Sequence, residues 1–277
     1  MTLTIFAVVL FAAALHAVWN AIVKGGSDTL LTTILVASSG GLIAICALPF
    51  LPTVAPAAWP YLAVSGVLEI TYYALVAGAY RNTEMSRSYP LMRGTAPLIV
   101  VLVSTVALGV ALSLPAWIGV ALVSAGLLGI ALARGGAGDP RGVRLALLNA
   151  VVIAAYTLVD GFGVRASGAP ATYTMWIYVL TGVPLALWAL ARRRDFPAYI
   201  ARNWHLGFIG GVGTLASYGL VLWAMTEAPI PVVAALRETS ILFGTAIAGL
   251  VLREKIGAAR IAAVLVIAAG AAVLRLA

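Results

Sequence analysis

Residues 3–23 read LTIFAVVLFAAALHAVWNAIV, and almost every side chain in this run is apolar. A helix needs about 20 such residues to cross the roughly 30 Å hydrocarbon core of a bilayer. Only helices and closed barrels can span, because lipid offers backbone groups no hydrogen bonds. The apolar residues here are continuous and do not alternate with polar ones, which excludes a barrel strand. This stretch therefore predicts a membrane-spanning helix.

Similar runs follow one another along the whole chain. Short stretches that carry glycine, proline or charged residues separate them, as is usual for turns between helices. The predicted spans are 3–23, 30–50, 59–80, 88–108, 114–133, 142–162, 171–191, 205–226, 231–251 and 257–276. The expected fold class is therefore an all-α integral membrane protein with ten transmembrane helices.

Composition supports this fold class. Hydrophobic residues make up 63% of the chain and charged residues 9%, whereas about a quarter of the residues in a soluble domain are charged. The net charge of +8 does not indicate a nucleic-acid partner, because the basic residues recur in short clusters between apolar runs. Loops beside anionic lipid have this pattern. We expect a multi-pass protein of the inner or plasma membrane, with the lipid bilayer as its partner.

An internal similarity divides the chain into two halves. LMRGT at residues 91–95 aligns with ALRET at residues 235–239. We expect one five-helix repeat at residues 1–134 and a second at residues 141–277, with a hinge between them. An odd number of helices in each half forces the two halves to insert with opposite orientations. Such inverted repeats are a recurrent plan of transporters, with the substrate near the midplane between them.

Lysine and arginine gather in the odd-numbered loops between the predicted spans, whereas the other side carries only Arg165 and Arg275. Because cytoplasmic loops are enriched in these residues, the odd-numbered loops are expected in the cytoplasm. Both chain termini are then expected on the opposite side.

Two stretches carry a family resemblance. LHAVWNAIVK at residues 15–24, and REKIG at residues 253–257 followed by Gly270, resemble the drug/metabolite transporter superfamily in its EamA-type branch of ten helices. The resemblance covers essentially the whole chain. It implies a central cavity lined mainly by helices 1, 3, 4, 6, 8 and 9. The family includes exporters of amino acids and other metabolites, as well as drug carriers.

Ionisable side chains inside a span are unfavourable by roughly 2.5–3.5 kcal/mol on insertion scales, so they face protein or water. Five candidates lie in or at the edge of spans, namely Glu69, Arg93, Asp160, Arg237 and Glu238. Arg93 and Arg237 occupy equivalent positions in the two halves, each near a helix start marked by proline. A guanidinium close to a helix N-terminus would bind a carboxylate or a phosphonate. Alternatively, each arginine pairs with Glu69 or Glu238 and locks helices together.

Glu69 shares one helical face with Tyr72, Tyr73 and Tyr80. This face could bind an amine through charge and cation–π contact. Glu69 could instead carry a coupling proton, because burial favours the neutral form of a carboxyl group. A third reading makes it the structural partner of an arginine. Glu238 is a weaker candidate for proton coupling.

His16, Trp19 and Asn20 share a face of the first span, where His16 is either a proton relay or a hydrogen-bonded packing residue. Asp160 is expected at the solvated membrane interface, and Tyr178 in packing or at the lipid interface. The expected substrate-binding residues are Arg93, Arg237, Glu69, Tyr73, Trp19, Asn20, Tyr89, Tyr156 and Tyr218. The expected proton-coupling residues are Glu69, His16 and Glu238.

The leading interpretation is a secondary active transporter, an exporter of a small metabolite such as an amino acid or a similar zwitterion or anion. A proton or solute gradient would drive it, and the two halves would alternate access to the site. The alternatives are a carrier of lipophilic cations, an intramembrane enzyme and a structural membrane subunit. The sequence lacks G-x-x-x-x-G-K-[ST], H-E-x-x-H and G-x-S-x-G motifs, so we expect no catalysis, cofactor or metal. Small residues in the last span, such as Ala258, Ala262 and Gly270, indicate close helix packing, either within the chain or in a homodimer.

Overall fold

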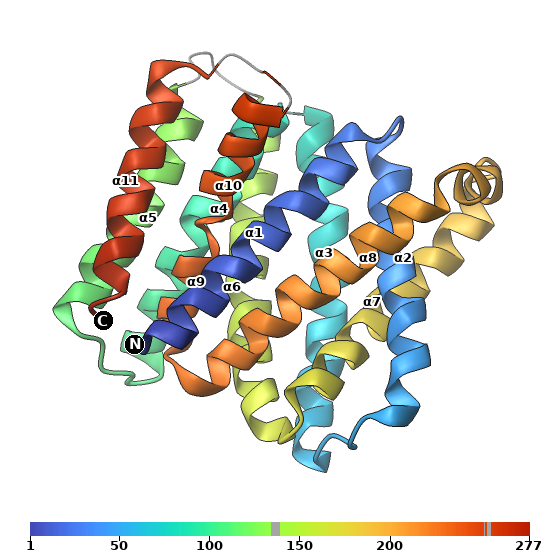
Figure 1. Ribbon diagram of the computed structural model, residues 1–277, viewed down its shortest axis with the longest axis horizontal. Helices are drawn as coiled ribbons and strands as arrows, with labels where there is room; N and C mark the ends of the chain where they lie inside the picture. Colours follow the sequence, from blue (N-terminus) through green and yellow to red (C-terminus); the bar gives the residue numbers. More distant parts are fainter. Residues whose placement is uncertain (83, 134–138, 252, 254–255) are drawn as a thin grey trace.

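The structure is a computed structural model that describes residues 1–82, 84–133, 139–251, 253 and 256–277. Its described residues form helices joined by short connections, which confirms the all-α fold (Figure 1). The α-helices are α1 (Leu3–Gly25), α2 (Thr29–Ala47), α3 (Trp59–Asn82), α4 (Met85–Leu102), α5 (Leu114–Ala133), α6 (Pro140–Ser167), α7 (Pro170–Arg192), α8 (Phe196–Glu227), α9 (Ile230–Arg237), α10 (Ser240–Ala246) and α11 (Ala258–Leu274). Most of the predicted hinge, and residues 254 and 255 of the REKIG stretch, lie outside the described residues.

Nine helical stretches among the described residues are long and apolar enough to cross a bilayer. The tenth predicted span corresponds to α11, which is apolar but has only 17 residues. It lies directly against α5, along the edge of the bundle (Figure 1). The chain is therefore a multi-pass membrane protein, whose described residues form ten main helical stretches. The inverted relation of its halves stays a prediction.

Two predicted spans differ most from the observed helices. The eighth span was expected from residue 205, but α8 begins at Phe196 because Pro197 suits a first helical turn and the buried Phe196 ring packs beside α2. The ninth span was expected as one continuous helix. It is interrupted at Glu238 and Thr239, between α9 and α10. The charged residues before residue 205 suggested a loop where α8 begins. The apolar residues on both sides of Glu238 and Thr239 suggested a continuous helix where α9 ends and α10 begins.

Helices distant in the sequence lie side by side across the bundle. Helix α1 packs against α8, α3 against α6, and α2 against both α7 and α8. The two chain termini lie together at one end of the molecule (Figure 1), where Arg275 donates a hydrogen bond of 2.6 Å to the Met1 carbonyl oxygen. The connections that follow α1, α3 and α7 lie at the opposite end.

Glycines let some of these helices approach closely. A Cβ atom at Gly126 would lie 2.9 Å from the Ala263 carbonyl oxygen, and one at Gly270 would lie 2.9 Å from the Val123 backbone nitrogen. Contacts of this kind allow dispersion forces to hold helices together in lipid. Gly270 therefore packs within the chain against α5, and a homodimer stays a prediction.

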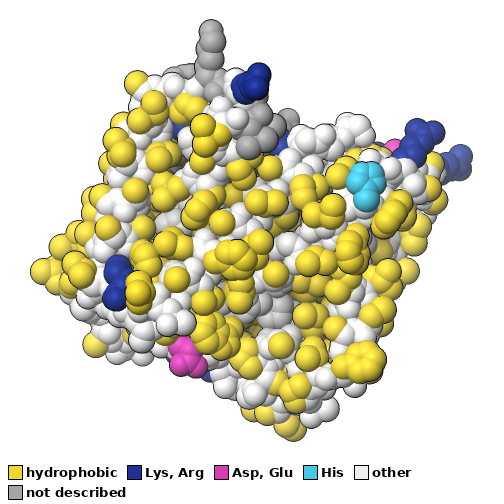
Figure 2. Space-filling model, viewed as in Figure 1, with side chains coloured by type: hydrophobic (Ala, Val, Ile, Leu, Met, Phe, Trp, Pro, Cys, Tyr) yellow, Lys and Arg dark blue, Asp and Glu magenta, His cyan; other side chains and the backbone are white. Residues whose placement is uncertain are grey.

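The outer surface is that of a protein in lipid. Large apolar side chains such as Phe50 and Val106 are 88% and 84% exposed. Figure 2 shows hydrophobic side chains over most of one face, with Lys and Arg concentrated toward the end opposite the termini. This distribution fits a bilayer around the middle and water or lipid headgroups at the ends.

Candidate functional site

A cavity that opens to solvent lies at the centre of the helix bundle, and we call it the central cavity. Its empty volume, with the open mouth included, is about 1000 Å³. Side chains from α1, α2, α3, α4, α6, α7, α8 and α9 line it. They are His16, Trp19, Asn20, Val23, Thr29, Thr33, Glu69, Tyr72, Tyr73, Val76, Tyr80, Tyr89, Arg93, Tyr156, Ile177, Tyr178, Thr181, Thr214, Ser217, Tyr218 and Arg237. The wall is therefore rich in tyrosine and contains charge, in a chain that is otherwise strongly apolar.

The central cavity begins at the end of the molecule opposite the termini. Val23 near the end of α1, Thr29 at the start of α2 and Tyr80 near the end of α3 line its mouth. It reaches to Glu69 and Tyr218, which lie in the middle of their helices. Beyond that depth the same helices meet in a buried apolar core. The structure is thus open toward one side of the membrane and closed toward the other.

All nine residues expected to bind substrate line this one cavity, as do Glu69 and His16 from the expected proton-coupling set. Glu238 lies just outside its wall. The expected helices contribute, but α2 and α7 contribute as well. Tyr178 of α7 was expected in packing or at the lipid interface; it packs against the core and also lines the cavity, a position that was not predicted. It shares a hydrogen bond of 2.8 Å with the Thr214 hydroxyl inside the wall.

Arg93 and Glu238 form a buried ion pair between the two halves of the chain. Arg93 Nε donates a hydrogen bond of 2.7 Å to Glu238 Oε2, and Arg93 Nη2 lies 2.7 Å from Oε1. The two residues are only 4% and 5% exposed. This contact agrees with the alternative interpretation of Arg93, in which the arginine pairs with a carboxylate and holds two helices together. Its partner is Glu238 and not Glu69.

Arg237 has no comparable partner. Among the described residues no carboxylate forms an ion pair with it, and its buried Nε–H group donates a hydrogen bond to no acceptor. Its guanidinium carbon lies 5.0 Å from the centre of the Tyr218 ring, a cation–π distance. The expected site at a helix N-terminus is wrong for both arginines. Arg237 ends α9, and Arg93 lies in the third turn of α4, because α4 continues through Pro90.

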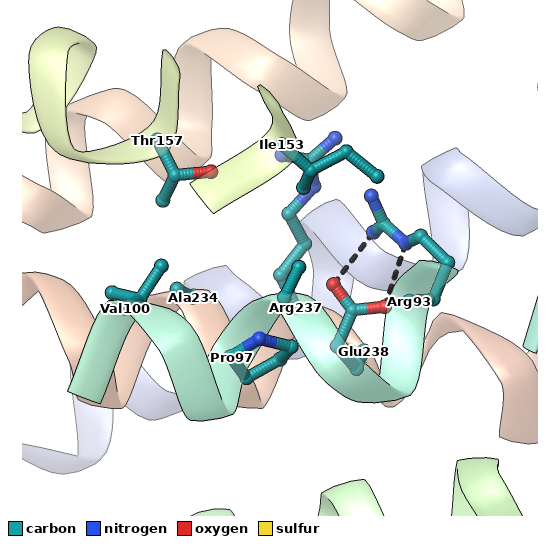
Figure 3. A pocket seen from close by; sticks show the side chains of 9 residues that line it. Arg93, Pro97, Val100, Ile153, Thr157, Ala234, Arg237 and Glu238 are labelled. Carbon is teal, nitrogen blue, oxygen red and sulfur yellow. Dashed lines mark hydrogen bonds and ion pairs between the residues drawn. The ribbon is translucent and has the colours of Figure 1, made fainter. Parts of the chain in front are cut away.

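A second, much smaller cavity lies beyond the ion pair. It follows α4 from Arg93 to Val100, away from the mouth of the central cavity. Figure 3 shows the Arg93–Glu238 pair and Arg237 side by side in its wall. Both arginines also line the central cavity, so these three side chains separate the two spaces.

Glu69 is half-buried on α3, and no described residue forms an ion pair with it. Aromatic rings surround this part of the wall. The Tyr72 ring lies 5.2 Å from that of Tyr73 and 6.0 Å from that of Tyr156, both edge to face. A carboxylate among ring faces is the arrangement that can bind an organic cation or an amine.

The face of α1 that carries His16, Trp19 and Asn20 turns toward the cavity, as the spacing predicts. The rings of His16 and Trp19 meet edge to face at 5.1 Å. Asn20 donates its amide hydrogen to the His16 carbonyl oxygen at 2.8 Å, so part of its hydrogen-bonding capacity is used within the helix. The buried Trp19 Nε1 has no hydrogen-bond partner among the described residues. It is an unpaired donor beside the cavity.

Asp160 was expected at the solvated interface, and that was wrong. Its exposed fraction is 0%, and its two oxygens accept hydrogen bonds from Tyr218 and Tyr173. Position in the sequence suggested a helix end, but α6 continues to Ser167 and buries this turn. The shared helical face of Asn149, Tyr156 and Asp160 was the signal that could have revealed an inward orientation.

These features define a multi-pass membrane protein with a polar, partly charged cavity at its centre. The family model described as the EamA-like transporter family matches residues 140–276, and the chain belongs to this family. It is therefore a membrane transporter of small molecules, and not an enzyme. A solved crystal structure is similar over 99% of this chain and 96% of its own, with a TM-score of 0.74 at 20% identity, which shows a shared fold. No curated protein matches the chain in sequence.

Proposed function

We propose that this transporter carries an amino acid or a similar zwitterion across the plasma membrane by alternating access. One observation carries the proposal. The central cavity contains a guanidinium, Arg237, and a carboxylate, Glu69, and neither forms an ion pair with a described residue. Unpaired charges of both signs at membrane depth are unfavourable unless a ligand or water meets them.

A zwitterion fits these two charges. Its carboxylate would pair with Arg237, since guanidinium and carboxylate form strong, charge-assisted hydrogen bonds. Its amine would lie at Glu69 among the rings of Tyr72 and Tyr73. Trp19 Nε1 would supply a further hydrogen bond. An anion with no amine would leave Glu69 unpaired, and we therefore favour the zwitterion.

The transport cycle that we propose uses the two halves of the chain, residues 1–134 and 141–277, as inverted repeats. The packing of α1 against α8 and of α3 against α6 supports this. In each pair, the first helix of one half packs against the third helix of the other half. Rocking of the halves would close the mouth and open the small cavity beyond Arg93 and Glu238. Export is the proposed direction, driven by a proton or solute gradient, with Glu69, His16 and Glu238 as candidates for proton coupling.

Purified protein in liposomes tests the site. A thermal-shift screen of the protein against the L-amino acids first identifies stabilising compounds, and uptake of these compounds is then measured in liposomes. We expect Arg237→Gln and Glu69→Gln each to abolish uptake while the protein stays folded. Arg275→Gln is the matched control, because Arg275 lies near the end of the chain, where its side chain donates a hydrogen bond to the Met1 carbonyl oxygen, and it does not line the cavity. Normal uptake in both cavity variants would refute the proposed site.

A carrier of lipophilic cations is a second candidate, favoured by the number of tyrosines in the cavity wall and by the unpaired Glu69. The free charge of Arg237 opposes it. Stabilisation of the protein by quaternary amines, with no effect of amino acids, would establish the cation carrier instead.

A further inference from the structure

Asp160 is a buried carboxyl group just outside the central cavity, behind the Tyr218 side chain. Tyr218 lines the cavity, and its hydroxyl donates a hydrogen bond of 2.5 Å to Asp160 Oδ2. On the other side, the Tyr173 hydroxyl donates a hydrogen bond of 3.2 Å to Asp160 Oδ1. One carboxyl group thus joins α6, α7 and α8 at a depth where no water reaches it, since its exposed fraction is 0%.

Gly163 leaves the space that the Tyr173 hydroxyl occupies. A Cβ atom at residue 163 would lie 2.1 Å from the Tyr173 hydroxyl oxygen and 2.6 Å from the Tyr61 Cβ atom. Both distances are impossible, so only glycine at this position lets the Tyr173 hydroxyl reach Asp160. The polar cluster of Asp160, Tyr173 and Tyr218 is therefore a built feature of the fold.

No described residue forms an ion pair with Asp160. The groups that face it are Tyr173 of α7, Tyr218 of α8, Glu69 and the Ser65 hydroxyl of α3, and Arg237 of α9. Arg165 on its own helix turns away, because its guanidinium donates to the Met225 and Ala228 carbonyl oxygens.

Arg237 therefore places a positive charge over the Tyr218 ring, 5.0 Å from the ring centre, and the hydroxyl of that ring is bonded to Asp160. This is the same side chain that presents an unpaired charge to the central cavity.

We propose that Asp160 is a proton-binding site of the transporter, linked to the substrate site through Tyr218 and Arg237. The link rests on the proposed function of Arg237. A substrate carboxylate that pairs with Arg237 cancels the charge that stabilises ionised Asp160. The carboxylate of Asp160 is then an isolated charge in apolar surroundings, which is strongly unfavourable. Protonation removes that charge.

The proton has a short path. Asp160 Oδ2 accepts the hydroxyl proton of Tyr218, so an O–H bond breaks on the tyrosine and one forms on the aspartate. The Tyr218 oxygen then takes a proton from a hydronium ion of cavity water and is neutral again. One proton enters for each carboxylate bound, and by linkage each favours binding of the other. The proton travels with the substrate, so export would be driven by the gradient of the solute itself.

The test needs no substrate. Infrared difference spectra of the purified protein in lipid are recorded between pairs of pH values. A protonated carboxyl group in apolar surroundings gives a C=O band above the amide I region. The band that Asp160→Asn removes belongs to Asp160. Tyr218→Phe gives an independent assignment, because loss of its hydrogen bond shifts the frequency of the same band.

Arg237→Gln mimics an arginine whose charge is cancelled. We expect the Asp160 band to persist to a pH roughly one unit or more higher in this variant than in the wild type. Arg237→Lys keeps the charge and should stay close to the wild type, and Arg193→Gln, far from the site on an exposed connection, should not differ.

Two results would overturn the inference. If neither Asp160→Asn nor Tyr218→Phe changes any carboxyl band at any pH at which the protein is folded, Asp160 binds no exchangeable proton. If the band titrates at the same pH in Arg237→Gln and in the wild type, the link to the substrate site is wrong. Failure of the proposed function is a separate outcome, because it would show as absent uptake of every amino acid and leave these spectra unchanged.

Discussion

Replacement of Glu238 by glutamine tests whether the ion pair between the halves holds the closed side of the transporter. Glutamine keeps the shape of the side chain and removes its charge, so the Arg93 guanidinium stays buried without a counter-charge. Both partners are almost completely buried and their closest atoms are 2.7 Å apart. Removing one partner of such a pair is unfavourable by about 3–5 kcal/mol.

Thermal unfolding in detergent, followed by tryptophan fluorescence, measures this loss. A change of 1 kcal/mol shifts Tm by roughly 2–4 °C in chains of about 150–250 residues, so Glu238→Gln should lower Tm by about 6–20 °C. Glu227→Gln is the matched control, because Glu227 is exposed at the end of α8 and its carboxylate accepts a hydrogen bond from its neighbour Thr226. Its Tm should equal that of the wild type.

The double variant Arg93→Met with Glu238→Gln separates charge from packing. With both charges gone, no uncompensated charge is left in the interior, and stability should recover most of the loss. The reasoning fails if Glu238→Gln is as stable as the wild type. It also fails if the double variant is as unstable as the single one, since the effect would then come from packing.

Three further predictions concern packing, pH and orientation. Gly163→Ala should destabilise the protein by about 1–3 kcal/mol in the same unfolding assay, because its Cβ would overlap the Tyr173 hydroxyl. Gly129→Ala, with open space around its Cβ, should leave stability unchanged. A Gly163→Ala variant as stable as the wild type would contradict the close approach. Hydrogen bonding from Arg193 lowers the pKa of Asp195. The pair therefore stabilises the protein at pH values above the usual pKa of an aspartate, and this stabilisation is lost as the pH falls through the lowered pKa. Plots of Tm against pH for the wild type and Arg193→Gln should converge at acid pH, and a constant difference would argue against the pair. The orientation can be tested with single cysteines on a Cys46→Ser background and a membrane-impermeant maleimide. Thr33→Cys at the cavity mouth should react when the reagent is on the cytoplasmic side, and Thr53→Cys when it is on the other side. The reverse pattern would refute the orientation expected from the loop charges.

Much of the candidate site could be located from local sequence features. A charge or a polar ring inside an apolar span must avoid lipid, and helical spacing then shows which side chains share a face. That reasoning led to Glu69, Arg237, Trp19 and Tyr156, which the structure brings together in the central cavity. Their role in binding stays a prediction.

Errors arose where a side chain's surroundings depend on another helix. Asp160 lies near a predicted helix end, and only the packing of α7 and α8 around it makes it buried. The place of Tyr178 in the cavity wall likewise depends on Thr214 of another helix, with which it shares a hydrogen bond. Hydropathy along the chain contains no information about such neighbours.

The amino-acid sequence by itself determined that this chain spans a bilayer repeatedly as helices, because the energy of apolar side chains and backbone groups in lipid depends on composition over about 20 consecutive residues. The tertiary structure decided which charges are satisfied. Arg93 meets Glu238 from 145 positions away, and Arg237, at the matching position of the other half, is left without a carboxylate among the described residues. Partners at such separations are chosen by the packing of whole helices, and that choice pairs one arginine with a carboxylate and leaves the other unpaired among the described residues.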